Sequence, residues 1–319
     1  MEKMLWDQKR YHSLDYELKK LYGKKIYKLS LDGGMTCPNR DGTLDTRGCI
    51  FCSEGGSGDF AAKPAVSIPE QISQAKKLVA AKLTNPESAG YIAYFQAYTN
   101  TYAPTDLLRS LFTEAASQPE IVLLSIATRP DCISDETIKL LKEIVHIKPV
   151  WIELGLQTMH DKSAAFIRRG YPLEVFENCV RRLKDAGIPV IVHTILGLPG
   201  ESPADIRRTM IYLSHLPIQG IKLQLLHILK GTDLGDLYEQ GSLPEPMTLE
   251  EYISLVISCL ELLPGEFVIH RVTGDGPRKL LLAPLWSTNK KLVLNRIQQG
   301  MKKTDTWQGK HYEAPPILP

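Results

Sequence analysis

The chain has 319 residues, of which 43% are hydrophobic and 23% charged, and its formal net charge at pH 7 is +2. This length favours one large domain with a small extension, and the composition excludes a disordered or fibrous protein. A net charge so close to zero means that any affinity for nucleic acid must come from a local patch. The sequence contains no apolar run that could span a bilayer and no signal peptide, so we expect no membrane partner. Its unpaired cysteines suggest a reducing compartment, so we expect a cytoplasmic protein.

Apolar and amphipathic segments alternate along most of the chain. After an N-terminal helical extension (1–25), the apolar segments predict strands at 26–31, 91–95, 121–126, 150–156, 190–196, 221–228 and 267–272. The segments between them predict helices at 68–83, 107–116, 135–145, 173–186 and 202–216, with Ser134 as an N-cap and Gly187 as a stop signal. This alternation predicts parallel βαβ units and therefore an α/β fold, with a partial (β/α)6 TIM-like barrel over 26–277. A short basic C-terminal extension (278–319) follows.

Three of the six cysteines lie close together in the sequence, at Cys37, Cys49 and Cys52. The last two form a C-x-x-C pair, and a Gly/Asp-rich loop separates them from the first. Three thiolates can hold an iron–sulfur cluster, but they leave a four-iron cluster one ligand short, and a substrate or cofactor could bind the open iron. The spacing also allows a zinc site with a fourth ligand from elsewhere, or structural thiols.

The other three cysteines are scattered. Cys132 follows the third predicted strand and could face a site at that end of the barrel. Cys179 and Cys259 lie in predicted apolar helices and are expected in the core.

Polar or glycine-rich residues follow each predicted strand, which matters because the active site of a parallel barrel lies at the carboxyl ends of its strands. After the cysteine loop come the segments 96–101, 127–131, 197–201 and 230–232, together with Glu153, Gln157, Gln224 and His227. Most of these alone would indicate a turn or a core residue, although Glu153 needs partners in its apolar strand. Together they predict one site at this end of the barrel.

Several of these motifs resemble those of radical S-adenosylmethionine (SAM) enzymes, over residues 26 to 232. Cys49-Ile50-Phe51-Cys52 is similar to the superfamily's C-x-Φ-C ending, where Φ is aromatic. The run from Lys28 to Gly42 resembles the YhcC/YtqA-like (MnmL-type) subfamily, which is related to the radical domain of the Elongator catalytic subunit. The segments 128–131, 153–157, 169–170, 197–201 and 229–232 fit the same relationship.

Two features differ from the common superfamily pattern. The gap between Cys37 and Cys49 is longer than usual, as expected for this subfamily. The segment 96–99 (Gln-Ala-Tyr-Thr) replaces the usual Gly-Gly-Glu-like turn, and Ala127 stands where related sequences often have Glu.

The resemblance implies a barrel of the radical SAM type in which Cys37, Cys49 and Cys52 hold a 4Fe-4S cluster and SAM binds the open iron. One electron from the reduced cluster would then cleave SAM to give a 5′-deoxyadenosyl radical, with an electron donor such as flavodoxin or ferredoxin. The implied cofactor-binding residues are Phe51, Gln96, Thr128, Arg129, Glu153, Gln157, Arg169, His193, Gly197, Leu198 and Pro199.

The resemblance also implies transfer RNA as substrate and partner, with conversion of 5-carboxymethylaminomethyluridine to 5-aminomethyluridine at the wobble position. The catalytic residues that face the substrate are not identified, and the candidates are Tyr98, His227, His270 and Arg271. The alternatives are a radical enzyme acting on a small molecule or tetrapyrrole, and a non-catalytic zinc- or RNA-binding protein.

Basic residues far outnumber acidic ones between positions 278 and 312, and three aromatic residues are interleaved with them. Positive charge for phosphates and aromatic rings for unstacked bases suit the recognition of an RNA loop. The predicted RNA contacts are Lys290, Lys291, Arg296, Lys302, Lys303, Trp307 and Lys310. An amphipathic helix over 290–303 with a solvated basic face is the other interpretation.

Overall fold

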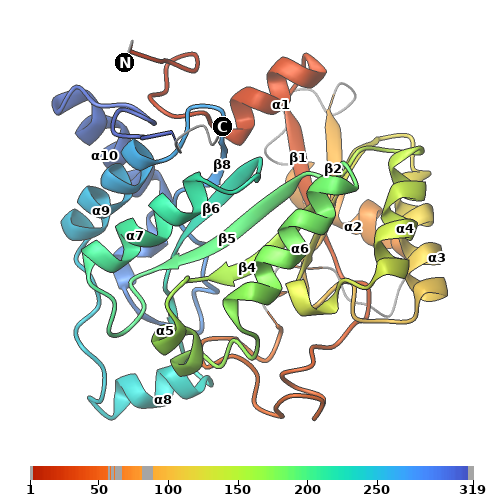
Figure 1. Ribbon diagram of the computed structural model, residues 1–319, viewed down its shortest axis with the longest axis horizontal. Coiled ribbons are helices and arrows are strands. Elements are labelled where there is room, and N and C mark those ends of the chain that lie inside the picture. Colours follow the sequence, from red (N-terminus) through yellow and green to blue (C-terminus); the bar gives the residue numbers. More distant parts are fainter. Residues whose placement is uncertain (1–2, 57, 59–60, 62–66, 81–88, 315–319) are drawn as a thin grey trace, which may run out of the picture. The chain divides into compact units, whose positions relative to one another are not determined.

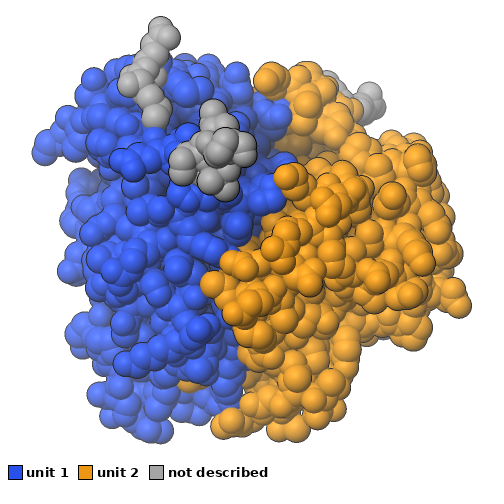
Figure 2. Space-filling view, viewed as in Figure 1, with its two compact units in different colours: residues 1–17, 156–169, 192–319 blue, residues 18–155, 170–191 orange. Residues whose placement is uncertain are grey.

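The structure is a computed structural model that describes residues 3–56, 58, 61, 67–80 and 89–314. The chain divides into two compact units, shown in Figure 2. Unit 1 contains Met1–Glu17, Leu156–Arg169 and Val192–Pro319, and unit 2 contains Leu18–Gly155 and Gly170–Ile191.

A seven-stranded sheet has the order β1-β2-β3-β4-β5-β6-β8. Its strands are β1 (Ile26–Leu31), β2 (Gly90–Phe95), β3 (Ile121–Thr128), β4 (Val150–Gln157), β5 (Val190–Leu196), β6 (Gly220–Leu225) and β8 (Val268–Arg271). Neighbouring strands from β1 to β4 pair in parallel, and so do β6 and β8. Every residue of β2 is buried, as expected for a parallel strand covered on both faces.

The helices of unit 2 follow its strands. They are α2 (Ile68–Ala80), α3 (Thr105–Ala116), α4 (Asp135–Val145) and α6 (Leu173–Asp185). In Figure 1, α3 and α4 lie side by side, and their buried faces include Phe112 and Leu141. The predicted cap of α4 is confirmed, because the Ser134 side chain accepts a hydrogen bond from the Thr137 backbone N–H.

Unit 1 contains the later helices and a small second sheet. Its helices are α5 (Asp161–Phe166), α7 (Pro203–Ser214), α8 (Asp233–Glu239), α9 (Leu249–Leu262) and α10 (Lys290–Lys303), while α1 (Leu14–Tyr22) begins in unit 1 and ends in unit 2. The small sheet pairs β7 (Ile228–Leu229) with β9 (Leu281–Ala283) in antiparallel fashion. The N-terminal residues pack against the end of the chain, where the His12 backbone N–H donates to Gln308 Oε1 at 2.8 Å.

Most predicted elements agree with the structure to within two residues, and 135–145, 190–196 and 290–303 agree at both ends. The predicted strand 221–228 is wrong in one respect, because β6 ends at Leu225 and a separate strand begins at Ile228. The Leu226 backbone N–H donates to Leu196 O at 3.0 Å, and the strand that follows, β7, pairs with β9. The predicted helix 68–83 ends at Ala80, and residues 81–83 lie outside the described residues.

No helix within the described parts of the chain is long and apolar enough to cross a membrane.

Candidate functional site

The cysteine loop begins where β1 ends, and a buried glutamine fixes its starting point. Gln71 of α2 is 1% exposed, its Oε1 accepts from the Asp32 N–H, and its Nε2 donates to Asp32 O, each at 2.9 Å. The paired amide holds the backbone of the first residue after the strand. The chain therefore leaves β1 in one direction and enters the loop that carries the cysteines.

Backbone hydrogen bonds fold the long stretch between Cys37 and Cys52 back on itself. Cys37 O accepts from Arg40 N at 2.8 Å, and Asn39 O accepts from Gly48 N at 2.7 Å. The Cys49–Cys52 turn closes through a bond of 2.9 Å from Cys52 N to Cys49 O. The segment between Cys37 and Cys49, which makes the motif longer than usual, is thus a compact loop whose end lies next to Asn39.

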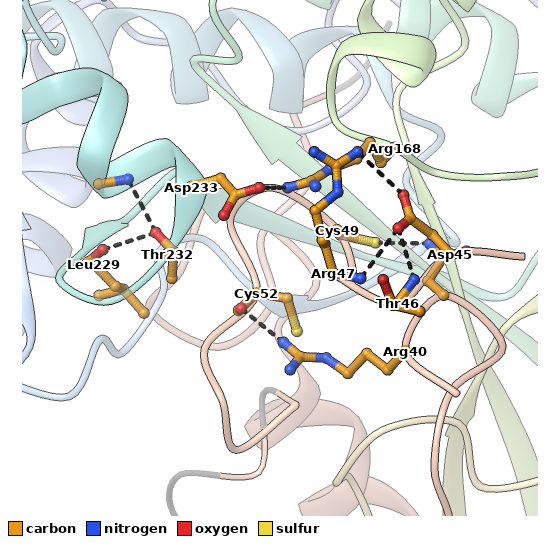
Figure 3. Close-up of polar contacts among 12 residues, drawn as sticks. Arg40, Asp45, Thr46, Arg47, Cys49, Cys52, Arg168, Leu229, Thr232 and Asp233 are labelled. Atoms are coloured by element: carbon orange, nitrogen blue, oxygen red, sulfur yellow. Dashed lines mark hydrogen bonds and ion pairs between the residues drawn. The ribbon is translucent and has the colours of Figure 1, made fainter. Parts of the chain in front are cut away.

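Arg40 clamps the far end of this loop, as Figure 3 shows. Its Nη2 donates to Cys52 O at 2.8 Å and to Ser53 O at 2.6 Å. Gly48 allows this approach, because a Cβ there would lie 2.8 Å from Arg40 Nε. Charged hydrogen bonds to carbonyls are among the stronger polar contacts, so Arg40 fixes the backbone that presents Cys52.

The arrangement of the three thiols is not that of a binding site for a single metal ion. Among the residues that the structure describes, no group of three or more His, Cys, Asp or Glu side chains could hold one metal ion. In a 4Fe-4S cluster each cysteine binds its own iron, so its thiolates do not meet at one point. Burial raises the pKa of the Cys49 thiol to about 12, so cluster assembly there must displace a proton.

Predicted residues at the end of β3 lie in the same unit as the cysteine loop. Arg129 has a side chain only 10% exposed, pairs with Asp131 Oδ2 at 2.6 Å and lies 5.0 Å from the Tyr171 ring centroid. Thr128 Oγ1 is 2.6 Å from Thr101 Oγ1. Arg129 is thus a cation held by its neighbours, and its predicted contact with the cofactor stays a prediction.

Tyr98 and Gln96 follow β2. Tyr98 has a φ of 55°, a left-handed conformation that costs free energy in a residue other than glycine. Its hydroxyl donates to Glu54 O at 2.5 Å, and a Cβ at Gly56 would come within 2.3 Å of its ring. Tyr98 therefore packs on the turn that follows Cys52. Gln96 Oε1 accepts from Ser30 Oγ at 3.2 Å.

Glu153 has the partners that its apolar strand demands. The side chain is 0% exposed, and Oε1 lies 2.7 Å from both Lys28 Nζ and Ser125 Oγ. Trp151 Nε1 donates to the same Ser125 hydroxyl at 2.5 Å. A buried carboxylate is tolerated only when it is paired and hydrogen-bonded in this way. Its predicted contact with the cofactor stays a prediction.

In unit 1, the end of β4 is joined to the turn after β5. Gln157 ends β4 with a φ of 69°. The next residue, Thr158, donates through Oγ1 to Glu201 Oε1 at 2.5 Å. Arg169, 2% exposed, donates to Thr158 O at 2.7 Å. Thr158, the residue after Gln157, thus links Arg169 to the 197–201 turn within this unit.

The turn after β5 takes a conformation that glycine favours. Gly197 and Gly200 have φ values of 90° and 86°, and Leu198 between them is 3% exposed. His193 is half-buried on β5 itself. Phe51, in the cysteine loop of unit 2, is half-buried as well.

A polar cluster lies at the carboxyl ends of β6 and β8 in unit 1. His227 is enclosed by a glycine loop, since a Cβ at Gly274 would lie 2.5 Å from its Cε1 and one at Gly276 would lie 3.2 Å from its Cγ. Burial lowers the pKa of His227 to about 4, and no described residue hydrogen-bonds its Nε2. Arg271 lies 3.3 Å from Asp275 Oδ2. His270 is half-buried on β8.

The basic extension forms the predicted amphipathic helix α10, with Val293, Ile297 and Met301 buried. Several of its cations have acidic partners: Lys290 Nζ lies 2.7 Å from Asp275 Oδ2, and Arg296 pairs with Glu250. Lys310 stands 5.3 Å from the Trp307 ring centroid. Lys291, Lys302 and Lys303 are exposed and make no ion pair with any described residue.

Sequence reasoning assigned no role to Asn39, Arg40 or Gln71. The first two lie inside a quoted motif, so a signal existed, but their partners depend on how the loop folds. Gln71 lies on a helix far along the chain, and nothing local marks it.

With this geometry described, comparisons with known proteins identify relatives. The family described as "Radical SAM superfamily" matches residues 46–213, and "Radical_SAM C-terminal domain" matches 218–303. The protein YtqA of Bacillus subtilis is 42% identical over 306 residues, covering 96% of this chain and 94% of YtqA. YhcC of Escherichia coli is 37% identical, covering 95% and 94%.

More distant similarity extends to a protein named for transfer RNA and to a solved archaeal structure. The tRNA uridine(34) acetyltransferase of Methanocaldococcus jannaschii is 24% identical over 171 residues, which cover 53% of this chain and 31% of that protein. The solved structure of the archaeal Elp3 of Methanocaldococcus infernus superposes with a TM-score of 0.65 at 16% identity, covering 89% of this chain and 64% of that one. The predicted α/β partial barrel is thereby confirmed.

Proposed function

Because the chain belongs to the radical SAM superfamily and is an enzyme whose cofactors are a 4Fe-4S cluster and SAM, we propose that it modifies the wobble uridine of transfer RNA. The observation that carries the proposal is its similarity to a protein named tRNA uridine(34) acetyltransferase. The proposed reaction converts 5-carboxymethylaminomethyluridine to 5-aminomethyluridine. The partners would be transfer RNA and a small electron donor such as flavodoxin or ferredoxin, in the cytoplasm.

Cys37, Cys49 and Cys52 would hold the cluster, and the loop around them fits that role. Arg40 and the bond from Gly48 to Asn39 hold the backbone next to Cys52 and Cys49, which supports this role. The bound cofactors supply a hydrogen-abstracting radical. The protein contributes position and the exclusion of solvent, to which the buried Arg129 and the half-buried Cys49 contribute.

Each unit by itself contains residues that we propose to contact SAM. Arg129, Thr128, Gln96, Glu153 and Phe51 belong to unit 2. Those of unit 1 are Gln157, Arg169, His193, Gly197, Leu198 and Pro199. The left-handed φ of Gln157 supports its assignment, because backbone strain in a residue other than glycine is typical of functional positions.

The substrate chemistry can be balanced with water as the only further reactant. The carbon between the secondary amine and the carboxylate would lose a hydrogen atom and one electron to the bound cofactors, and the amine nitrogen would lose its proton to a base, which gives an imine. Water adds to the imine carbon, the C–N bond breaks, and the products are the primary amine and glyoxylate. In this balance the substrate would lose two electrons, and the bound SAM would supply the net oxidising power.

His227, Arg271, His270 and Tyr98 stay the candidates for contact with the substrate. Burial lowers the pKa of His227 to about 4, so the imidazole is neutral at physiological pH and would act as a hydrogen-bonding group rather than as a base. Arg271, which faces Gln224 Oε1 at 3.5 Å, could bind the carboxylate.

Nucleoside analysis of transfer RNA from a strain lacking the gene tests the assignment. We expect 5-carboxymethylaminomethyluridine to accumulate and 5-aminomethyluridine to fall, with reversal by the wild-type gene but not by a Cys49→Ala allele. Unchanged wobble nucleosides would contradict the assignment and favour a small-molecule or tetrapyrrole substrate.

A further inference from the structure

Asn39 makes a direct contact with one of the three cysteines. Its Nδ2 lies 3.4 Å from Cys49 Sγ, a hydrogen bond from the side-chain amide to the sulfur. The residue is only 1% exposed, so water does not compete for this bond. A thiolate can only accept hydrogen bonds, which requires the amide to present its N–H group to the sulfur.

The surroundings of Asn39 hold the amide in this position. Its carbonyl accepts from the Gly48 N–H at 2.7 Å, which fixes the backbone beside Cys49. On the other side, a Cβ at Gly170 would lie 2.7 Å from Asn39 Oδ1 and 3.4 Å from Arg129 Nη2. A side chain at position 170 would therefore displace the amide, in addition to straining a backbone whose φ is 81°.

We propose that Asn39 is a positioning residue that sets the reduction potential of the cluster through its hydrogen bond to Cys49. Reduction places extra negative charge on the cluster and its thiolates, and a buried N–H donor stabilises that charge. Hydrogen bonds to the sulfurs are among the factors that fix the potentials of iron–sulfur clusters. The amide thus makes the one-electron reduction that primes the cluster for catalysis more favourable.

The inference rests on Cys49 as a cluster ligand and not on the identity of the substrate. A wrong substrate assignment would leave it intact, whereas a cluster that survives Cys49→Ala would remove its basis.

A redox titration of the reconstituted holoenzyme, followed by the electron paramagnetic resonance signal of the reduced cluster, tests the proposal. Asn39→Leu removes the donor at similar volume, and Asn39→Asp replaces it with a negative charge. We expect Asn39→Leu to lower the reduction equilibrium constant at least tenfold, which moves the midpoint about 59 mV more negative. Asn39→Asp should move it further in the same direction.

Asn100→Leu is the matched control. Asn100 is also a buried asparagine of unit 2, at 0% exposed, but its Nδ2 donates to Ala127 O at 2.9 Å and not to sulfur. A midpoint of Asn39→Leu equal to that of the wild type, or an equal shift in Asn100→Leu, would overturn the proposal. So would failure of both Asn39 variants to take up iron, because the proposal gives Asn39 no part in assembly.

A glycine pair provides an independent test that leaves Asn39 in place. Gly187 has a φ of 71° but no atom within 4 Å of an added Cβ, so Gly187→Ala introduces backbone strain alone. Gly170→Ala adds the clash with Asn39. Only Gly170→Ala should shift the midpoint, and equal midpoints in the two variants would contradict the proposal.

Discussion

The cysteine loop and the basic extension both stood out in the sequence, but the structure builds them in different ways. In the loop, charged and polar side chains turn inward to backbone groups and sulfur, as Arg40 does to Cys52 O and Asn39 does to Cys49 Sγ. In the extension, cations pair across the surface, as Lys290 does with Asp275 at 2.7 Å. The loop is arranged to hold one geometry, whereas exposed pairs contribute little to stability and can be exchanged for a ligand.

This difference suggests that the loop performs the chemistry and the extension contributes adaptable binding. Changes in the loop should affect the cluster sharply, and changes in the extension should affect affinity in proportion to charge. The predictions below separate these effects, from the largest to the smallest.

Cys49→Ala should abolish the visible absorption of the cluster and the formation of 5′-deoxyadenosine altogether. The far-ultraviolet circular dichroism should stay that of the wild type, because Cys49 lies in a loop outside the helices and strands. Cys259→Ala, in the buried face of α9, is the control and should keep the cluster. Retention of a full cluster in Cys49→Ala would refute the proposed ligand set.

Arg40→Ala should loosen the loop without removing a ligand. Two hydrogen bonds from a charged group are lost, each contributing about 1.5–3 kcal/mol, so we expect a loss of roughly 3 kcal/mol in local stability. The cluster should then be extracted by a chelator about 100-fold faster. Arg47→Ala, whose side chain is 64% exposed, should leave the rate near that of the wild type; equal rates in the two variants would contradict the clamp.

His227 should make the stability of unit 1 depend on pH. Burial lowers its folded-state pKa to about 4, below the usual value, so the unfolded chain binds the extra proton between about pH 6.5 and pH 4. Its contribution is therefore complete above about pH 6.5 and is lost as the pH falls through this window, by roughly 2–3 kcal/mol. Urea unfolding at pH 7 and pH 4.5 should show the loss in wild type and a smaller one in His227→Leu. An equal loss of stability in the wild type and in His227→Leu would show that groups other than His227 cause it.

Lys302→Gln with Lys303→Gln should weaken binding of transfer RNA without altering the cluster. Two phosphate contacts contribute about 1.4 to the slope of log K against log salt for single-stranded regions, and the slope should flatten by that amount. The matched control changes Lys139 and Lys142 to Gln, two exposed lysines of α4 in the other unit. An unchanged slope in the α10 variant would show that the basic face of this helix is solvated and does not contact phosphates.

The sequence predicted those parts of the molecule that periodic patterns and short motifs encode. Strands and helices followed from the alternation of apolar residues, and the caps at Ser134 and Ser202 lie where helices were expected to begin. The split between β6 and β7 was missed because Leu226 is as apolar as a strand residue, and its backbone bond to Leu196 arises only in the folded chain.

The candidate site was predictable in its residue types but not in its supporting contacts. The three cysteines, Arg129 and Gln157 follow from motifs. The roles of Asn39 and Gly170 depend on a contact between residues more than a hundred positions apart, which no local pattern encodes. The buried partners of Glu153 were required on physical grounds, but Lys28 and Ser125 could be named only from the structure.

The most direct test of the whole account is one anaerobic reaction of the reconstituted enzyme with dithionite, SAM and transfer RNA that carries 5-carboxymethylaminomethyluridine. We predict that 5′-deoxyadenosine, glyoxylate and 5-aminomethyluridine form in equal amounts. Formation of 5′-deoxyadenosine without any change in the transfer RNA would contradict the proposed substrate. A reaction that yields no 5′-deoxyadenosine from an enzyme with a complete cluster would contradict the proposed chemistry itself.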